Sequence, residues 1–413
     1  MTIGGRLCPG ERPGIVSTGL RLGSAEAAFL KREVSGPMSL VIVTGSIAPY
    51  THRLYEAYAE ASGEEVTVLG CAAIEPQRAW QIPEAKHYKL EVLSGWRHHA
   101  SYTSHAYFNP SVVSALRRLK PDTVILWGGF SPTMALAAGY ARATGTPYGV
   151  ATDGALATDP GETSRVHGLM RRLLVPSASF GVCASQASVE LLARWGLSRE
   201  RSVVVPIVVA WDGPAEIPGY DARPFDILFA GALNEHIKGA LFFADVIDRC
   251  CQQGLKPKVR IVGDGPHRDE LQARLAQSGV KAQFDGYLQA DALPAAYGSA
   301  KLLMFPSRGD TWGLVANEAV LCGTPVIGSP HAVSSHELIE PFGVGLVSPL
   351  DVEAWAAAAS DILSSPERWK QFSRNREDAV RWFSLEKSLA EFTRAVSFAG
   401  RSPGLAANVE QAI

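Results

Sequence analysis

The chain has 413 residues, of which 46% are hydrophobic and 19% are charged, with a formal net charge of −2. This length exceeds what one ordinary core organises, so it predicts two or three folded domains, and the composition excludes a disordered chain. The charged residues form no long run of one sign, so nucleic-acid binding through a basic surface is not expected.

The cysteines and the apolar segments bear on the compartment in which the protein works. The six cysteines form no CxxC pair and no metal-ligand spacing, so we expect free thiols in a reducing cytosol. The longest uncharged run, residues 123–141, contains turn signals at Gly128-Gly129 and Ser131-Pro132, which indicate a strand, a turn and a helix start instead of a membrane span. No signal peptide is evident. A cytoplasmic location is therefore expected, with peripheral contact at the inner membrane face left open.

Residues 1–37 are interpreted as an uncertain N-terminal tail. They contain Gly, Pro and Arg without clear periodicity, and Met38 stands directly before the first strong strand. Two interpretations stay open: the natural start is Met38, or the preceding residues are a loose tail.

From residue 39 onward, short apolar runs alternate with segments of helical period, which defines a first domain of residues 38–205. Asn109-Pro110 is typical of a helix N-cap followed by the first helical residue, and Ser131-Pro132 repeats this signal. The expected strands are 39–44, 123–127, 147–151 and 203–205, and the expected helices are 109–119, 131–143 and 185–195.

The composition changes over residues 206–224, where four prolines and two glycines predict a linker between domains. The alternation restarts in a second domain of residues 225–383, and a helix at about 384–400 is expected to pack back on the first domain. The expected strands are 225–230, 259–262, 302–305, 325–327 and 344–347, with helices at 239–251 and 292–300, from 314, near 334 and from 351.

This regular alternation predicts parallel sheets that are covered by helices on both faces. Two such blocks predict an α/β protein with two doubly wound, Rossmann-like domains that face a central cleft. Ligands of such sheets bind beyond the carboxyl ends of the strands, so the cleft is the expected site.

The strand, loop and helix within residues 305–327 form the most informative segment. The helix begins near Leu314, where unpartnered N–H groups and the helix dipole favour an anion, and Gly313 lets a diphosphate approach the backbone. Glu318 lies about one turn into the helix, where a carboxylate can accept two ribose hydroxyls, and Asp310 can meet hydroxyls of a sugar. The alternative is that Asp310 is a loop or capping residue and Glu318 a solvated helix residue.

Three further glycine turns precede this segment, and the first two lie between a strand and a helix. The turn at 231–239 contains Lys238, which can neutralise a leaving diphosphate or be an ordinary surface lysine. The turn at 263–266 reads Gly-Asp-Gly-Pro, and a purely structural role is its alternative. The turn at 286–288 completes the series in chain order.

In this order the motifs resemble those of the retaining family 4 glycosyltransferases with the GT-B fold, the glycosyl transferases of group 1. The series is Gly231…Lys238-Gly239, Gly263-Asp-Gly-Pro266, Gly286-Tyr287-Leu288, Asp310-x7-Glu318 and Gly323-Thr-Pro325-Val. The similarity covers roughly residues 225–363, and the first half is similar to one branch of the family at Pro49-Tyr50, at the helix after Asn109 and at Lys120-Pro-Asp122.

The resemblance implies a hexosyltransferase that moves a sugar from a nucleoside-diphosphate sugar to an acceptor hydroxyl with retention. It implies that Glu318 binds the ribose, Asp310 the donor sugar and Lys238 the diphosphate. The remaining donor-binding residues are expected to be Gly313, Leu314 and Val315 at the phosphates, Gly286, Tyr287 and Leu288 near the base, and Gly231, Gly263 and Arg308.

Three positions depart from the family pattern. The usual first Glu is Asp310, one methylene shorter, the usual Arg of the first turn is Ala232, and a His that often follows the fourth or fifth strand is matched by Asp153. The lost cation is expected to weaken diphosphate binding by roughly 1.5–3 kcal/mol. Arg308 or His236 is the candidate to compensate.

The resemblance also implies how the reaction proceeds. The expected acceptor-binding residues are Gly45, Ser46 and Ile47. Domain closure expels water, and the leaving phosphate takes the acceptor's proton in a front-face attack, or Asp153 acts as a base. The catalytic residues are thus Asp310, Asp153 and Lys238. No Asp-x-Asp motif follows a strand, so neither a metal nor another cofactor is expected.

Other functions and partners stay open. A GT-B nucleotide-sugar 2-epimerase needs no acceptor, and the departures at Ala232, Asp310 and Asp153 also suit a non-catalytic pseudo-glycosyltransferase that serves as a partner subunit. The acceptor is a saccharide, lipid-linked or small molecule, in bacterial polysaccharide or glycolipid biosynthesis or in a glycosylated small-molecule pathway. Arg171-Arg172 in a helix indicates contact with a membrane or anionic acceptor, or a solvated face.

Overall fold

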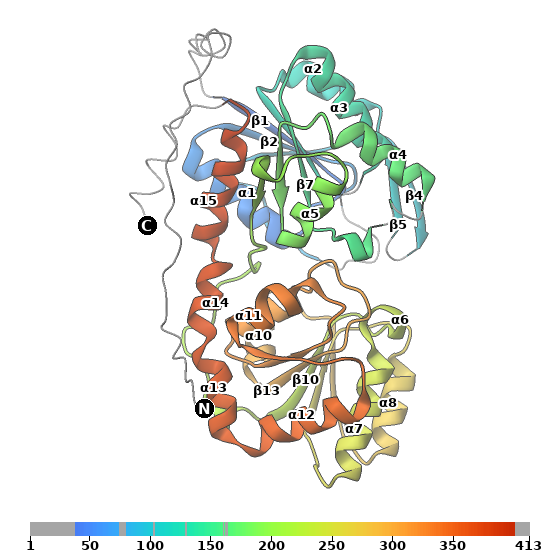
Figure 1. Cartoon of the computed structure of the whole chain (residues 1–413), viewed down its shortest axis with the longest axis vertical. Helices are drawn as coiled ribbons and strands as arrows, with labels where there is room; N and C mark the ends of the chain where they lie inside the picture. Colours follow the sequence, from blue (N-terminus) through green and yellow to red (C-terminus); the bar gives the residue numbers. More distant parts are fainter. Residues whose placement is uncertain are drawn as a thin grey trace, which may run out of the picture. The chain divides into compact units, whose positions relative to one another are not determined.

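The computed structural model describes residues 38–73, 80–101, 104–128, 130–159, 161 and 164–400. The tail predicted for residues 1–37 lies outside the described residues. Within the described ranges, two parallel sheets each form the centre of a domain, and a short antiparallel hairpin accompanies the first (Figure 1).

The first domain contains a seven-stranded parallel sheet with the strand order β3-β2-β1-β6-β7-β8-β9. Its strands are β1 (Ser39–Thr44), β2 (Glu65–Gly70), β3 (Lys89–Val92), β6 (Thr123–Trp127), β7 (Tyr148–Thr152), β8 (Phe180–Cys183) and β9 (Ser202–Val204), and its hairpin is β4 (Trp96–Ser101) with β5 (Ser104–Phe108). Its helices are α1 (Pro49–Ser62), α2 (Ser111–Leu119), α3 (Pro132–Thr144), α4 (Arg165–Leu174) and α5 (Gln186–Arg194). The four middle residues of β1, Leu-Val-Ile-Val, are all apolar and buried because helices cover both faces of the sheet.

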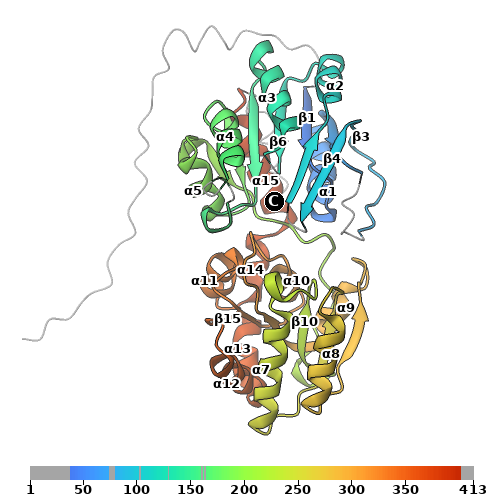
Figure 2. The ribbon, with the colours of Figure 1, turned by 90° about the vertical axis from the view of Figure 1, so that its right-hand side faces the viewer.

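The second domain contains a six-stranded parallel sheet with the order β12-β11-β10-β13-β14-β15. Its strands are β10 (Phe225–Ala230), β11 (Val259–Val262), β12 (Gln283–Gly286), β13 (Ala300–Phe305), β14 (Val326–Gly328) and β15 (Gly345–Val347). Its helices are α6 (Glu235–Lys238), α7 (Ala240–Gln252), α8 (Arg268–Gln277), α9 (Leu293–Gly298), α10 (Val315–Leu321), α11 (Glu340–Phe342), α12 (Val352–Ser364), α13 (Pro366–Arg374) and α14 (Arg376–Trp382). Figure 2 shows α7 and α8 side by side on one face of this sheet.

The last helix, α15 (Leu385–Ser397), packs on the first domain against α1 and β9. Its Phe392 is fully buried and meets Tyr58 edge to face at 4.9 Å between ring centroids. The hydroxyl of Ser388 donates a hydrogen bond of 2.8 Å to the carbonyl of Pro206, so the helix also contacts the start of the linker.

Both sheets reverse their strand order at one point, between β1 and β6 and between β10 and β13. Loops after such neighbouring strands diverge to opposite faces and leave a crevice at the carboxyl edge. Thr44 and Trp127 lie opposite each other at the first reversal, and Leu228 and Leu303 pair near the second. The loops after β1, β10 and β13 therefore begin at the ligand-binding edges of their sheets.

The strands predicted from the sequence are present within one or two residues of the expected bounds. The pattern did not predict β2, β3, β4, β5, β8 or β12. β4, for example, has the polar sequence Trp-Arg-His-His-Ala-Ser, and β3, β8 and β12 have only four residues each. The helix expected near residue 334 is a π-helical turn, Ser335–Ile339, that continues into α11.

Candidate functional site

A cavity of about 530 Å³ lies at the carboxyl ends of β10, β11 and β13. Its lining includes ten of the predicted donor-binding or catalytic residues of the second domain: Gly231, Lys238, Gly263, Tyr287, Leu288, Asp310, Gly313, Leu314, Val315 and Glu318. We call this cavity the donor pocket. Segments separated by up to about ninety positions in the sequence thus meet because they follow neighbouring strands of one parallel sheet.

Glu318 is a buried carboxylate in the lining of the donor pocket, not a solvated helix residue. Only 8% of its surface is exposed, and its Oε2 accepts a hydrogen bond of 2.5 Å from the hydroxyl of Tyr297. Burial raises the pKa of Glu318 to about 7, and the hydrogen bond from Tyr297 opposes part of that rise. When it is ionised, a carboxylate that is buried in a cavity is a strong acceptor for the hydroxyl groups of a ligand.

Lys238 and Asp310 form an ion pair in the same pocket. Lys238 ends the short helix α6, and Asp310 lies in the loop after β13, where its N–H donates to the carbonyl of His331 at 3.1 Å. Both side chains are mostly buried, and the ammonium of Lys238 also lies 5.9 Å from the ring centre of Phe305. The pair therefore places one positive and one negative group at neighbouring points of the cavity wall.

Two glycines of the lining are required by the protein's own packing. Gly313 has a φ of +98°, and a Cβ there would lie 2.5 Å from the ring of Phe305. Gly263 has a φ of +128°, and a Cβ would lie 1.9 Å from the carbonyl oxygen of Gly231. The sequence pattern attributed Gly313 to phosphate approach and left a structural role open for the turn at Gly263; at both positions steric contact with the protein already excludes a side chain.

Arg308 and His236, the candidates to compensate for the missing arginine at Ala232, are not among the described residues that line the donor pocket. Arg308 pairs with the carboxylate of Glu235 and donates to its carbonyl at 3.1 Å, and it is not among the described residues that line the donor pocket. His236 is exposed and also lies outside that lining. The guanidinium of Arg308 is paired with Glu235, and its contact with the donor stays a prediction. Gly286 lies beyond the described lining as well.

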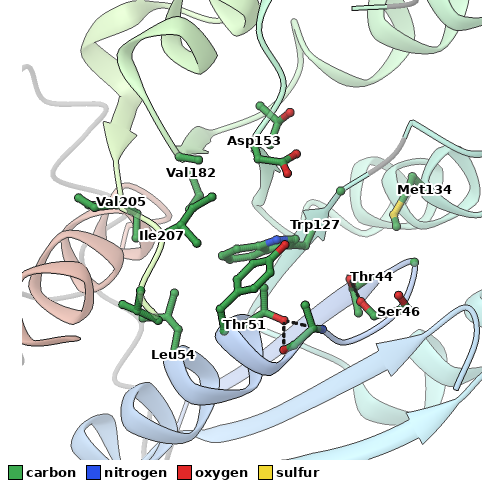
Figure 3. A pocket seen from close by; sticks show the side chains of 18 of the residues that line it. Thr44, Ser46, Thr51, Leu54, Trp127, Met134, Asp153, Val182, Val205 and Ile207 are labelled. Atoms are coloured by element: carbon green, nitrogen blue, oxygen red, sulfur yellow. Dashed lines mark hydrogen bonds between the residues drawn. The ribbon is translucent and has the colours of Figure 1, made fainter. Parts of the chain in front are cut away.

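A second cavity, of about 290 Å³, lies at the carboxyl ends of β1, β6 and β7 in the first domain. We call it the acceptor-side pocket. Figure 3 shows Trp127 in the middle of its lining, with Asp153 above and Thr44 and Ser46 to one side. Gly45 lines it too, whereas Ile47 is 3% exposed and belongs to the hydrophobic core, so its side chain does not reach the described lining.

The two pockets share four lining residues: Tyr50, Trp80, Asp153 and Ile207. Asp153 is exposed, and its Oδ2 lies 3.5 Å from the hydroxyl of Thr311 in the donor pocket. Of these four, only Asp153 was predicted as a site residue. Trp127 was missed because it ends the apolar run of a buried strand, and Tyr50 and Trp80 were missed because no motif around them points to a ligand.

A carboxylate of the second domain caps a helix of the first. Glu337 accepts hydrogen bonds of 2.8 and 2.9 Å from the N–H groups of Gln186 and Ala187 at the start of α5. A helix N-terminus favours such a negative charge.

Arg171 of the first domain is not on the surface. It is buried and paired with Asp159, so of the Arg171-Arg172 pair only Arg172 is exposed.

Within the described residues, no group of three or more His, Cys, Asp or Glu side chains is arranged to hold a metal ion. Five cysteines, Cys71, Cys183, Cys250, Cys251 and Cys322, are free thiols. None of the helices in these ranges is long and apolar enough to cross a membrane.

Residues 224–365 match the family model described as "Glycosyl transferases group 1", and residues 45–207 match the one described as "Glycosyl transferase 4-like domain". The chain belongs to the group 1 glycosyltransferases. The first match covers the second domain, which holds the predicted donor-binding residues of the donor pocket, and the second match covers the first domain of this glycosyltransferase.

The glycosyltransferase also resembles individual proteins. It is 28% identical over 303 residues to a GDP-mannose-dependent alpha-mannosyltransferase of Mycolicibacterium smegmatis, covering 66% of this chain and 73% of that protein. Over 115 residues it is 33% identical to a 2-deoxystreptamine N-acetyl-D-glucosaminyltransferase of Streptomyces fradiae, covering 27% of each. HepE of Anabaena in complex with UDP has a TM-score of 0.68 at 17% identity, covering 87% of this chain and 100% of that chain, which shows the shared GT-B fold.

Proposed function

We propose that this glycosyltransferase moves a hexosyl group from a nucleoside-diphosphate sugar to an acceptor hydroxyl, with retention of the anomeric configuration. The observation that carries the proposal is the donor pocket, in which the buried carboxylate of Glu318 and the Lys238–Asp310 pair line one cavity. A ribose, a diphosphate and a sugar need these three kinds of group. The name of the mycobacterial relative includes GDP-mannose, and HepE was crystallised with UDP, which supports a nucleotide donor of this class.

Each part of the donor is assigned by its chemistry. The ribose hydroxyls donate to Glu318, and Asp310 accepts from hydroxyls of the sugar. Because α10 has only seven residues, its dipole is small, and we assign the diphosphate mainly to Lys238 and the backbone N–H groups near Gly313. Lys238 must then exchange part of its contact with Asp310 for the phosphate oxygens, which frees the carboxylate to meet the sugar.

The acceptor binds in the acceptor-side pocket, beside Gly45 and Ser46, with its hydroxyl directed to the donor through the shared wall at Asp153. The bond between the anomeric carbon and the diphosphate oxygen breaks, and the bond to the acceptor oxygen forms on the same face. The acceptor's proton passes to the leaving phosphate or to Asp153. Lys238 stabilises the charge that develops on the diphosphate. This scheme assigns no role to a metal or cofactor.

The test combines a donor panel with an acceptor panel. UDP-glucose, UDP-N-acetylglucosamine and GDP-mannose are each incubated with 2-deoxystreptamine, a phosphatidylinositol mannoside and simple glycosides, and the product's anomeric configuration is read by NMR. Replacing Glu318 with Ala should raise the donor KM at least tenfold, because a charge-assisted hydrogen bond is worth roughly 1.5–3 kcal/mol. Unchanged turnover in this variant would remove Glu318 from the site.

The same assay separates the remaining functions. Release of free sugar without any acceptor, with inversion at carbon 2, identifies a 2-epimerase. Nucleotide binding without turnover of any donor–acceptor pair identifies a non-catalytic partner subunit. Ala232 at the position of the usual arginine is consistent with this function. Transfer to the lipid acceptor favours a polysaccharide or glycolipid pathway, and transfer to 2-deoxystreptamine favours a small-molecule product.

We also propose that helix α4 makes a peripheral contact with an anionic membrane surface. Val166, Leu169 and Leu173 are 68%, 54% and 44% exposed along one face of this helix, and Arg172, also exposed, flanks that face. Buried apolar area combined with basic charge is what binds an amphipathic helix to anionic lipid. Leu169→Ser should reduce sedimentation with phosphatidylglycerol vesicles, whereas Leu90→Ser, an exposed leucine of β3, should not; equal binding of all three proteins would refute the contact.

A further inference from the structure

A buried tyrosine donates a hydrogen bond to the carboxylate that binds the ribose in the proposed function. Tyr297 lies in α9 with 1% of its surface exposed, and its hydroxyl donates to Oε2 of Glu318 at 2.5 Å. Both residues line the donor pocket. We propose that Tyr297 is a positioning residue, which holds the Glu318 carboxylate so that Oε1 faces the hydroxyls of a nucleotide ribose. This inference rests on the proposed function, in which Glu318 binds that ribose.

A hydrogen bond from Thr324, which in turn is held by Arg223, fixes the backbone of Tyr297. Its carbonyl accepts a hydrogen bond of 2.8 Å from the hydroxyl of Thr324, and Thr324 accepts one of 2.6 Å from Arg223. Arg223, only 2% exposed, also donates to the carbonyl of Cys322 at 2.9 Å, just after the helix that carries Glu318. One buried guanidinium thus ties α9 to the end of α10, so the tyrosine hydroxyl and the carboxylate keep their relative position.

The oxygen atoms of Glu318 limit how the ribose can bind. A carboxylate offers about four acceptor positions on two oxygens, and Tyr297 takes one of those on Oε2. The tyrosine has a single O–H to donate, so it cannot also satisfy Oε1. The side of the carboxylate left for a ligand is therefore Oε1, which suits a pair of neighbouring hydroxyl donors. Without the tyrosine hydroxyl, the carboxylate can rotate and loses its buried donor.

The hydrogen bond also bears on the charge of the carboxylate. Burial raises the pKa of Glu318 to about 7, and the Tyr297 hydroxyl lowers it from where burial alone would put it. The other titratable group that interacts electrostatically with both residues is Cys322, which in turn is near Arg223 and Arg376. Ribose hydroxyls bind the ionised carboxylate best, so nucleotide affinity should fall as the pH drops through about 7.

The experiment compares the wild type with Tyr297→Phe and with Tyr58→Phe, using calorimetric titration of UDP and GDP between about pH 6 and 9. Tyr58 is the matched control because it is a buried tyrosine, 2% exposed, that donates to the carboxylate of Glu64 at 2.9 Å in the first domain. In Tyr297→Phe we expect about tenfold weaker binding at neutral pH, and a midpoint of the pH dependence about one to two units higher. Tyr58→Phe should keep both values.

The outcomes are distinct. A Tyr297→Phe protein that melts earlier but keeps the wild-type dissociation constant and pH midpoint makes Tyr297 a structural residue and overturns the inference. If the wild type binds neither diphosphate, the proposed function falls and this inference falls with it. Should the phenylalanine variant not fold, site-specific 3-fluorotyrosine at Tyr297, a stronger donor, is expected to move the midpoint to lower pH, and an unmoved midpoint refutes the role.

Discussion

Replacing Glu318 with Gln tests whether the buried carboxylate lowers the stability of the folded protein and also binds the donor. The glutamine keeps the shape and can still accept from Tyr297, but it cannot ionise. Because burial raises the pKa of Glu318 from 4.5 to about 7, the folded protein binds this proton more tightly than the unfolded chain does. The wild type therefore loses stability as the pH rises from about 4.5 through about 7, and the variant does not.

The size of the effect follows from the pKa. A rise from 4.5 to about 7 corresponds to about 3 kcal/mol of lost stability once the pH lies well above 7. The stability difference between Glu318→Gln and the wild type should grow by about 2–3 kcal/mol from about pH 5 to pH 8, in favour of the variant. At the same time the variant should lose stabilisation by UDP or GDP, because an amide is a weaker acceptor for the ribose than a carboxylate.

Urea unfolding followed by tryptophan fluorescence measures this difference, since Trp312 lies in the donor pocket close to the site. Glu200→Gln, which removes an exposed carboxyl in the first domain, is the matched control. Parallel stability curves of the wild type and Glu318→Gln across this pH range would refute the reasoning that a buried, ionisable carboxylate is kept for ligand binding. A variant that is more stable and still binds nucleotide would refute only the ribose assignment.

The other predictions concern the charges around the pockets. Lys238→Met should lower kcat/KM by about ten- to a hundredfold in the transfer assay, since it removes the cation expected at the leaving group; an unchanged value would move the diphosphate elsewhere. Glu337→Gln should weaken the cap on α5 by up to about 1 kcal/mol and raise the radius of gyration in small-angle scattering of the unliganded protein, and an identical scattering curve would show that this contact does not hold the domains. Arg171→Met should cost about 3–5 kcal/mol in urea unfolding because it leaves Asp159 buried without its partner, whereas Arg172→Met should be nearly neutral; equal effects would contradict the buried pair.

The sequence alone was enough to predict the two sheets and the strand ends at which the candidate site lies. Apolar runs such as that of β1 need cover on both faces, and a glycine turn after a strand marks where a parallel sheet meets its ligand. Local signals of this kind act between neighbours in the chain. For that reason the loop before α10 and the positions of Asp310 and Glu318 could be predicted from short motifs.

The tertiary structure decided which of these side chains reach the cavity and what holds them. Arg308 turns to Glu235, 73 positions earlier in the chain, and Ile47 enters the core, so neither lines its predicted pocket. Tyr297 meets Glu318 only because α9 and α10 are brought together beside one sheet. Such partners depend on packing between distant segments, and no local pattern records which of several nearby charges or hydroxyls will be close enough to bind.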